Sequence, residues 1–509
     1  MATNLDDHAV STTVCVPWSD VRAKLLRCSL LLLVWIVAAA MSVWAVEFPD
    51  GALESVVRDV LAKPNGELSK QDLARLLELD VAFAGVTDLS GLEFACNLRV
   101  LDLVGNDLTS IDPLAELVHL EVLWLDFTGT RTLQPLQGLV NLRDLGLAGN
   151  SVADVAPLMT CSRLERLNLR DSAITDIAGL AGLDGLEELN LQRNFVEDLT
   201  SLGELARLRI LHLDGNRITD LAPLTKLVEL EILTADNNRF KDLAPLAGCV
   251  SLHTLSLADN AVESVHPLGA LPNLRFLAIG GNQVSDLSPL GSLGSLETLD
   301  LSRNRINEAA LAPLAQLSRL RVLNVAGNDL ASLAGLAGAR SLEIIDAYGN
   351  AVRDLDPLGS LDRLRILDVS GNRVVSLVPL ASLRGLTVLR LRANAVTDLA
   401  PLAELAELVV LDIGFNDVRD LSPVASCSNP AVLLADGNDI EELSGLAGLP
   451  SIHELNLAHN LLQTVAGLSA LLGAGDVVDL RWNLLDLSPG GNVRQEIQRL
   501  LDTGVTVKR

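Results

Sequence analysis

Hydrophobic and polar positions repeat with a period of 22 residues along most of the chain. In the stretch LRLRANAVTDLAPLAEL, residues 389–405, an L-x-L pair precedes Asn394 and apolar positions follow it. Counted from this asparagine, apolar residues recur at +8, +11, +14, +17 and +19, as at Leu402, Leu405, Leu408, Leu411 and Ile413. Because alternate side chains of a strand point to opposite faces, the pattern predicts one short β-strand per repeat and one face of every coil buried in a shared core.

The asparagine position defines a column of nineteen slots, at 84, 106, 128, 150, 172, 194, 216, 238, 260, 282, 304, 328, 350, 372, 394, 416, 438, 460 and 483. Sixteen slots hold Asn, and the exceptions are Ala84, Thr128 and Ser172. An amide offers donors and an acceptor to the backbone groups that a sharply turning coil leaves unpaired. We therefore expect the asparagines to bond inward, Thr128 and Ser172 to replace them in part, and the first coil to depend on the segment before it.

A second polar column lies four residues after the asparagine. Ten slots hold aspartate, namely Asp88, Asp154, Asp176, Asp198, Asp220, Asp242, Asp286, Asp354, Asp398 and Asp420, and Ser or Thr fills six more. These residue types cap helices, and the proline that recurs at +7, such as Pro401, suits a first helical turn. The pattern predicts a short 3₁₀ turn per coil. The alternative, a calcium ladder, lacks a glycine-rich ligand loop, so we expect capping and no metal.

The two ends of the repeat carry different patterns. Residues 48–79 contain two amphipathic helix patterns separated by KPNGEL, with Ser69 and Asp72 placed as a capping box. Residues 492–501 read as a helix, followed by an extended GVTV. Solenoids need polar lids because terminal coils would otherwise expose leucine to water. We expect a helical N-terminal cap at 47–79, a solenoid of about 19 repeats at 80–489 and a C-terminal cap at 490–509.

The N-terminus has a different character. A basic and polar segment, residues 1–27, precedes the uncharged run CSLLLLVWIVAAAMSVWAV at 28–46, and acidic residues follow. This charge order places the bulk of the chain outside the cytoplasm. Val43 and Ala45 fit a signal-peptidase cut before Val46, but nineteen apolar residues also nearly span a bilayer. The run is therefore either a signal peptide or a membrane anchor, and we expect an exported protein that is secreted or held in the cell envelope.

The signature L-x-x-L-x-L-x-x-N appears as LTVLRLRAN at residues 386–394. Over roughly residues 47–509 the chain resembles the leucine-rich repeat family, and its 22-residue register and capped ends are similar to secreted bacterial proteins of the internalin type. The resemblance implies an α/β solenoid, a curved horseshoe with a parallel concave sheet and short 3₁₀ turns on the convex side. It also implies a scaffold that binds a partner.

Charge and cysteine placement exclude several classes of function. A net charge of −26, from 65 acidic and 39 basic residues, argues against binding nucleic acid, and membrane contact is expected only through residues 28–46 if they are uncleaved. Cys161, Cys249 and Cys427 replace core leucines four and eight coils apart, and Cys96 is three coils from Cys161. These separations exceed the reach of a disulfide. The sequence lacks metal-binding or catalytic spacings, so we expect no enzyme activity and no cofactor.

Aromatic residues gather at positions −6, −4, −2 and −1 from the asparagine, which we expect to face the concave surface. Seven of the ten aromatics beyond Phe48 lie there: Phe83, Trp124, Phe127, Phe276, Tyr348, Phe415 and Trp482. Exposed aromatics are common anchors of protein interfaces. Trp124 and Phe127 are the strongest candidates, because Gly105, Gly146 and Gly149 on adjacent coils should leave their rings uncovered.

A charged patch is expected on four consecutive coils, from Asp346, Tyr348, Asp368, Arg390, Arg392, Asp412 and Phe415. Arg390 shares its position with Asp368 and Asp412 on the neighbouring coils, so these charges either bind a partner or neutralise one another at under about 1 kcal/mol per pair. The partner-binding residues we expect are Phe83, Trp124, Phe127, Phe276, Tyr348, Asp368, Arg390, Arg392 and Phe415.

The sequence favours a non-enzymatic, exported or membrane-anchored scaffold with a protein ligand on its concave face. A glycan ligand at the surface is a second possibility. The main alternative is a regulatory leucine-rich repeat protein that faces the cytoplasm and acts on another enzyme. The identity of the partner and the oligomeric state stay open at this stage.

Overall fold

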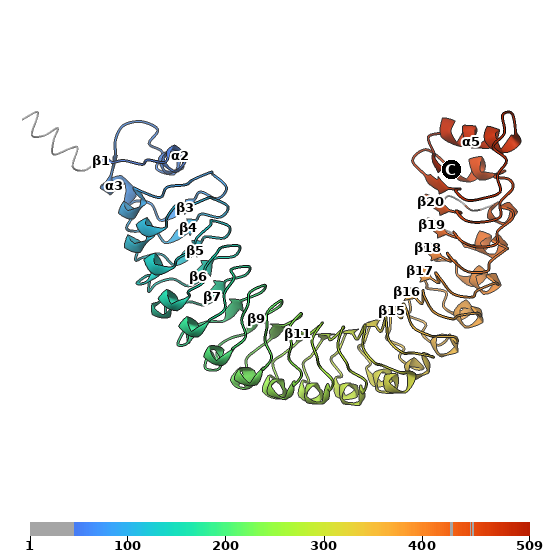
Figure 1. Cartoon of the computed structure of the whole chain (residues 1–509), viewed down its shortest axis with the longest axis horizontal. Helices are drawn as coiled ribbons and strands as arrows, with labels where there is room; N and C mark the ends of the chain where they lie inside the picture. The colour runs from blue at the N-terminus through green and yellow to red at the C-terminus, as the bar shows by residue number, and fades with distance from the viewer. Residues whose placement is uncertain (1–44, 428–430, 448, 450–451) are drawn as a thin grey trace, which may run out of the picture.

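The chain forms a horseshoe-shaped solenoid with strands on the inner side and short helices on the outer side (Figure 1). The structure is a computed structural model that describes residues 45–427, 431–447, 449 and 452–509. The expected segment 1–27 and residues 28–44 of the expected signal peptide or anchor lie outside the described residues. Within those residues, no helix is both long enough and apolar enough to cross a membrane.

The inner side is a parallel sheet of twenty strands, one for each coil and one for the C-terminal cap. Each strand pairs in register with the next, as in Leu277 opposite Leu299. Among the described residues, β3 pairs only with β4 and β22 only with β21, so the sheet is open (Figure 1). The strands are β3 Glu78–Asp80, β4 Val100–Asp102, β5 Val122–Trp124, β6 Asp144–Gly146, β7 Arg166–Asn168, β8 Glu188–Asn190, β9 Ile210–His212, β10 Ile232–Thr234, β11 Thr254–Ser256, β12 Phe276–Ala278, β13 Thr298–Asp300, β14 Val322–Asn324, β15 Ile344–Asp346, β16 Ile366–Asp368, β17 Val388–Arg390, β18 Val410–Asp412, β19 Val432–Leu434, β20 Glu454–Asn456, β21 Val477–Asp479 and β22 Thr506–Lys508.

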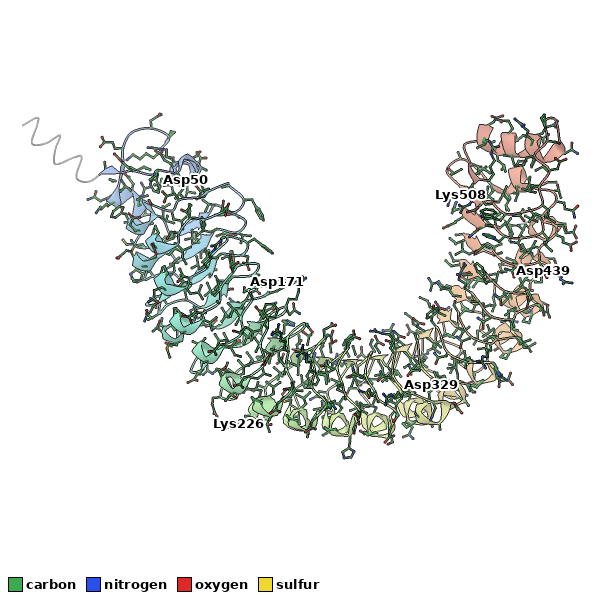
Figure 2. The ribbon with its side chains drawn as sticks, viewed as in Figure 1. Asp50, Asp171, Lys226, Asp329, Asp439 and Lys508 are labelled. Atoms are coloured by element: carbon green, nitrogen blue, oxygen red, sulfur yellow. The ribbon has the colours of Figure 1, made fainter. Side chains whose placement is uncertain are left out.

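The outer side carries the predicted 3₁₀ turns. They are η1 Leu92–Phe94, η2 Asp112–Glu116, η3 Gln134–Leu136, η4 Ala156–Thr160, η5 Ala178–Leu180, η6 Thr200–Leu202, η7 Ala222–Lys226, η8 Ala244–Gly248, η9 His266–Ala270, η10 Ser288–Ser292, η11 Glu308–Gln316, η12 Ala334–Leu336, η13 Asp356–Leu358, η14 Val378–Ser382, η15 Ala400–Glu404, η16 Ser422–Ser426 and η17 Ser444–Leu446. Lys226, at the end of η7, lies on this outer side (Figure 2).

The aspartate column bonds to the start of these turns, as the sequence predicts, although Asp198, for example, lies one residue before the N-cap residue Leu199. The carboxylate of Asp198 accepts the backbone N–H of Thr200 at 2.8 Å, and the other nine aspartates each accept the N–H two residues ahead. The six Ser and Thr residues of the column accept the same bond. Each side chain therefore satisfies an N–H that the short turn leaves without a partner.

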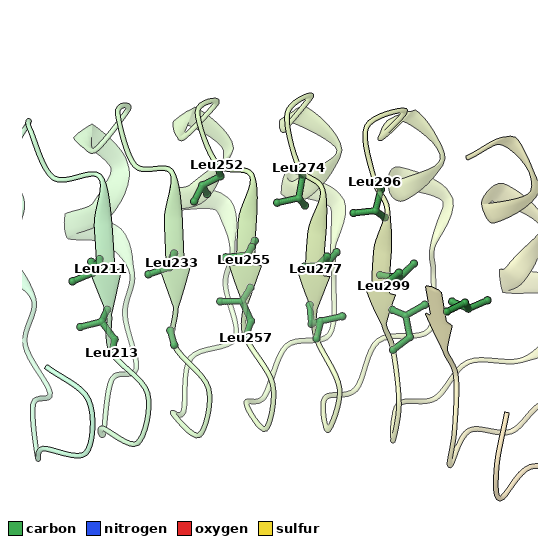
Figure 3. Close-up of a cluster of buried hydrophobic side chains, with 14 of the residues drawn as sticks. Leu211, Leu213, Leu233, Leu252, Leu255, Leu257, Leu274, Leu277, Leu296 and Leu299 are labelled. Atoms are coloured by element: carbon green, nitrogen blue, oxygen red, sulfur yellow. The ribbon is translucent and has the colours of Figure 1, made fainter. Parts of the chain in front are cut away.

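The core is built from columns of leucine that stack from coil to coil. Figure 3 shows Leu211, Leu233, Leu255, Leu277 and Leu299 side by side along the sheet, and all five are fully buried. Each coil covers the apolar face of the next, so only the two terminal coils need a lid.

The asparagine column joins neighbouring coils, as expected. Asn282 donates to the carbonyls of Leu257, 2.9 Å away in the preceding coil, and Ile279, and its side-chain oxygen accepts the N–H of Val262 at 2.9 Å. Thr128 replaces only the bond within its own coil, to Leu125, whereas Ser172 reaches the carbonyl of Leu147 in the preceding coil. Both substitutions are partial, as their single hydroxyl groups predict.

Asn260 departs from this pattern. Its amide nitrogen makes the usual donor bonds, but its buried oxygen has no hydrogen-bond partner in the described part of the chain. The N–H that should fill this role belongs to Phe240, which is fully buried where the adjacent coils place Ile218 and Val262. The larger Phe240 ring thus coincides with one missing hydrogen bond in the asparagine column.

The N-terminal cap contains α2 Gly51–Val60 and α3 Lys70–Leu73, and β1 Ala45–Val46 pairs antiparallel with β2 Leu68–Ser69. The capping box of Ser69 and Asp72 is present. The second predicted helix is a single turn, because the chain must enter β3 by Glu78.

Asp50 ties this cap to the first coil. It caps α2 through the N–H groups of Ala52 and Leu53, and it also accepts the N–H of Thr87 at 2.7 Å. Figure 2 places Asp50 at the N-terminal end of the arch. The coil of Ala84, which has no side-chain amide, is therefore held by the cap, as the sequence predicts.

The C-terminal end is closed by α4 Leu468–Leu471, α5 Asn492–Asp502 and β22. The sequence predicts both α5 and an extended segment after it. Strand β22 adds to the main sheet beside β21, so the lid continues the sheet rather than covering its edge.

Two extra residues after Ile306 lengthen only the outer side. Helix η11 has nine residues where η10 has five and η12 has three, while Leu299 in β13 still faces Leu323 in β14. The inner face keeps its register across the insertion.

Candidate partner-binding site

The aromatic residues expected on the concave face are partly exposed. The exposed fraction is 77% for Phe83, 63% for Phe127, 50% for Phe415, 56% for Tyr348 and 72% for Trp482. Trp124 and Phe276, which lie within strands β5 and β12, are less exposed at 36% and 38%. Large apolar side chains therefore face solvent on several coils.

The −1 position differs from what strand alternation predicts. In all nineteen coils this residue has a positive φ, and eleven of the nineteen are not glycine. Phe83, Phe127, Phe415 and Trp482 belong to this set, so they lie on a left-handed turn after the strand rather than on the pleat itself. Asp171, another member, lies toward the inside of the arch (Figure 2). Such a conformation costs roughly 1–3 kcal/mol for a non-glycine residue.

Three of these rings lie over a glycine of the next coil. A Cβ on Gly105 would collide with the ring of Phe83, one on Gly149 with the ring of Phe127, and one on Gly437 with the ring of Phe415. The sequence predicts that glycines leave the Phe127 ring uncovered. The structure corrects the assignment: Gly149 lies beneath Phe127, whereas Gly105 lies beneath Phe83. Each glycine leaves room for a ring that a side chain at that position would displace.

Trp124 and Phe127 form, with Asp102 and Asp126, what we call the N-terminal patch. Asp102 is the register partner of Trp124 on the preceding strand. The Asp126 carboxylate and the Trp124 ring both occupy the space over Gly146, where a Cβ would meet them. Partial burial, together with the charges of Asp102 and Asp144, raises the pKa of Asp126. The patch thus combines exposed aromatic rings with crowded carboxylates.

A second group, the C-terminal patch, is formed by Arg392, Asp412, Phe415 and Asp436. The Arg392 guanidinium lies 4.5 Å from the centre of the Phe415 ring, 2.8 Å from the Asp436 carboxylate and 3.6 Å from that of Asp412. Hydrogen bonding to Asp436 raises the pKa of Arg392, and burial raises the pKa of Asp412. Asp436 is not among the residues expected from the sequence, because it lies 44 residues from its partner, two coils further along.

The two arginines of the expected charged patch therefore differ in their contacts. Arg390 is in register with Asp368 and Asp412, as predicted. The ion pairs, however, are made by Arg392, and no acidic group of the described residues lies within 4.0 Å of the Arg390 guanidinium. Asp346, beside Tyr348, has a pKa raised by burial and by the charge of Asp368. Arg390 thus lies between two acidic register neighbours without an ion pair among the described residues.

The cysteine and histidine side chains outside these patches have structural surroundings. Cys161 and Cys249 are buried in the core, and burial raises the pKa of each thiol to about 11. Among the described residues, no group of three or more His, Cys, Asp or Glu side chains is arranged to hold a metal ion. At the C-terminal end His459 stacks on Trp482 with ring centres 5.5 Å apart, which extends the aromatic surface of that end.

A family model described as leucine-rich repeats in two copies matches residues 96–140, 162–204, 206–248 and 250–292. The matched segments carry the asparagine ladder and the in-register strands described above. The chain is a leucine-rich repeat protein. No curated protein matches it over its sequence.

Solved structures similar to this leucine-rich repeat protein include both bacterial and plant proteins. An internalin from Listeria monocytogenes is 27% identical, with 72% of this chain and 96% of that chain covered and a TM-score of 0.54. A leucine-rich repeat protein from Leptospira interrogans is 22% identical, with coverage of 86% and 97% and a TM-score of 0.60. A plant peptide hormone receptor in complex with RGF2 is 20% identical, with coverage of 83% and 80% and a TM-score of 0.61. The latter two show the shared fold.

Proposed function

We propose that this protein is a non-enzymatic scaffold that binds a protein partner on its concave face and acts outside the cytoplasm. The observation that carries the proposal is the set of exposed aromatic rings in left-handed positions, Phe83, Phe127 and Phe415. A glycine at each of these positions would adopt the left-handed conformation without strain. Because the rings are exposed, replacing them would remove little buried apolar surface. Exposed aromatics retained at such a cost fit interface anchors.

The similarity to an internalin and to a peptide hormone receptor supports a role in protein binding outside the cell. The strongly acidic composition is compatible with this role and disfavours nucleic acid. Secretion or anchoring through residues 28–46 belongs to the same proposal. The alternative, a cytoplasmic regulator of an enzyme, requires the opposite topology.

The binding surface is tested with full-length protein and a captured, purified partner. Replacing Phe127 and Phe415 together by Ser should weaken binding at least about tenfold, because two aromatic anchors are lost. The matched control is Val378→Ser, since Val378 is 67% exposed but belongs to η14 on the outer side. Equal affinity of the double variant and wild type would overturn the concave-face proposal.

Topology is tested separately with alkaline phosphatase fused after Arg509. The enzyme folds into its active form only when exported, so an active fusion supports an exterior location. An inactive fusion, with an active cytoplasmic reporter at the same site, would favour the regulatory alternative.

A further inference from the structure

Both aromatic patches have an exposed phenylalanine one residue before the asparagine slot, Phe415 and Phe127. Their carboxylates lie in different slots, since the positions of Asp412 and Asp436 correspond to Trp124 and Ala148. In the C-terminal patch, the Phe415 ring and the carboxylates of Asp412 and Asp436 surround the guanidinium of Arg392. In the N-terminal patch, aromatic rings and carboxylates are present, but the position that corresponds to Arg392, two residues before the asparagine of the preceding coil, holds Val104. The C-terminal patch therefore contains a cation of its own, whereas the N-terminal patch has none among the described residues.

The carboxylates of the N-terminal patch lack positive partners. Nearby Asp144 is paired with Arg166 at 2.8 Å, and Arg170 pairs with Asp171. In contrast, neither Asp102 nor Asp126 has an Arg, Lys or His nitrogen within 4.0 Å among the described residues. Asp102 accepts the backbone N–H of Val104, and Asp126 accepts the backbone N–H of Ala148 and, at 3.4 Å, the neutral side-chain amide of Asn168. A cation placed here would relieve the repulsion between these carboxylates.

The two aromatic residues of this patch are partly exposed, Phe127 at 63% and Trp124 at 36%. The Phe127 ring occupies the space where a Cβ on Gly149 would lie, and Trp124 shares the space over Gly146 with the Asp126 carboxylate. A guanidinium or ammonium group is attracted to an aromatic face and to carboxylates at once. The protein uses this chemistry elsewhere too, since Arg217 lies 4.6 Å from the centre of the Phe195 ring.

We infer that the N-terminal patch binds a positively charged side chain, an arginine in the first instance, presented by a basic protein partner. The inference rests on the proposed function and specifies the chemistry of the partner. A second copy of this chain is a poor occupant, because each copy carries a net charge of −26. Arginine from the partner would take the place relative to Phe127 that Arg392 takes relative to Phe415.

The probe is a pentaarginine peptide, compared with the same peptide built from citrulline, a neutral isostere. Binding to the full-length protein is measured by calorimetry in about 0.3 M sodium chloride, which shortens the range of the general acidic field. We expect the arginine peptide to bind and the citrulline peptide not to bind. Phe127→Leu and Asp126→Asn should each weaken binding by about fivefold or more, as the loss of a cation–π contact or a charge predicts.

Two controls separate the patch from the rest of the protein. Phe195→Leu removes an exposed aromatic whose ring already carries Arg217, and Asp236→Asn removes a carboxylate whose pKa is likewise raised by burial. Both should change the affinity less than about twofold. A third variant, Val104→Arg, supplies the missing guanidinium from within and should compete with the peptide, lowering its affinity as strongly as Phe127→Leu.

Equal losses in the patch variants and the controls would overturn the inference, since the peptide would then sense only the general charge. Equal binding of the arginine and citrulline peptides would overturn it as well. The proposed function fails in a different way: a purified partner would then bind the Phe127→Ser, Phe415→Ser double variant as tightly as wild type. A partner that needs Phe127 but binds Asp126→Asn normally would leave the proposed function intact and refute the charge-based inference.

Discussion

The guanidinium of Arg392 makes two hydrogen bonds, of 3.0 and 2.8 Å, to the carboxylate of Asp436, which lies two coils further along the solenoid. Because the Asp436 side chain is only 8% exposed, this pair is better shielded from solvent than an ordinary surface ion pair. Asp436→Asn should lower the free energy of unfolding by about 1 kcal/mol. The measurement is denaturant unfolding monitored by circular dichroism.

The control for this pair is Asp439→Asn. Asp439 pairs with Arg419 at 3.2 Å, but both side chains are exposed, so its loss should cost less than about 0.5 kcal/mol. Equal effects of the two substitutions would show that burial of Asp436 does not strengthen its ion pair.

Gly149→Ala should destabilise the protein more than Gly349→Ala. Both glycines have a φ of +67°, so both substitutions meet the same backbone strain. Only at Gly149 would the new methyl group collide with an aromatic ring, that of Phe127, whereas the nearest atom at Gly349 is 3.8 Å away. We expect a difference of roughly 1–3 kcal/mol, as for overpacking. Adding Phe127→Ala to Gly149→Ala should remove most of that difference, and failure to do so would contradict the proposed packing of ring on glycine.

Most of the fold is predictable from the sequence because the 22-residue period fixes which side chains are buried and which groups turn the chain. The left-handed column is a different case. Strand alternation predicts a pleated position for Phe127, although glycine at eight of the nineteen equivalent slots was a signal for positive φ. Asp436 could not be assigned to Arg392 from register alone, because the long side chain passes over Gly414 to reach it. Sequence periodicity thus predicts contacts between adjacent coils better than contacts between coils that are separated by a third.

Asn282→Ala should cost more than Asn260→Ala. Asn282 donates to backbone carbonyls and accepts from Val262, whereas Asn260 makes only the donor bonds. Removing Asn282 leaves one more buried group unpaired, which predicts a loss of roughly 1 to 3 kcal/mol at Asn282 and about 1 kcal/mol less at Asn260. Denaturant unfolding, resolved by local transitions where the solenoid unfolds in steps, provides the comparison. An unchanged midpoint for Asn282→Ala would contradict the role of the ladder.

The stability of Asp126→Asn relative to wild type should rise with pH. Burial and the neighbouring carboxylates raise the pKa of Asp126 above its ordinary value of 3.8, so the folded protein holds this proton more tightly than the unfolded chain. The stabilisation from this proton is present below the ordinary pKa and is lost as the pH rises through the raised one. The asparagine does not titrate. Unfolding free energies of both proteins between about pH 3.5 and 7 provide the test, and a pH-independent difference would refute the raised pKa.

Sodium chloride should raise the melting temperature modestly, and calcium chloride at the same ionic strength should do no more. The aspartates at 154, 176, 198, 220 and 242 occupy successive coils, and each already accepts a backbone N–H at 2.8 Å. Salt screens the repulsion between them. A large calcium-specific stabilisation that disappears in Asp198→Asn would instead reveal a metal site in this column.

The longer turn η11 has a consequence for how such a chain can change over generations. Two additional residues lengthen the outer side between Ile306 and Leu317, while the strands on either side keep their pairing. Insertions there leave the geometry of the inner face untouched, and a duplicated 22-residue unit would simply add one more strand to it. The proposed ligand surface and the tolerance to changes in length therefore lie on opposite sides of the arch. Changes in the length of the outer turns can accumulate without altering the inner face.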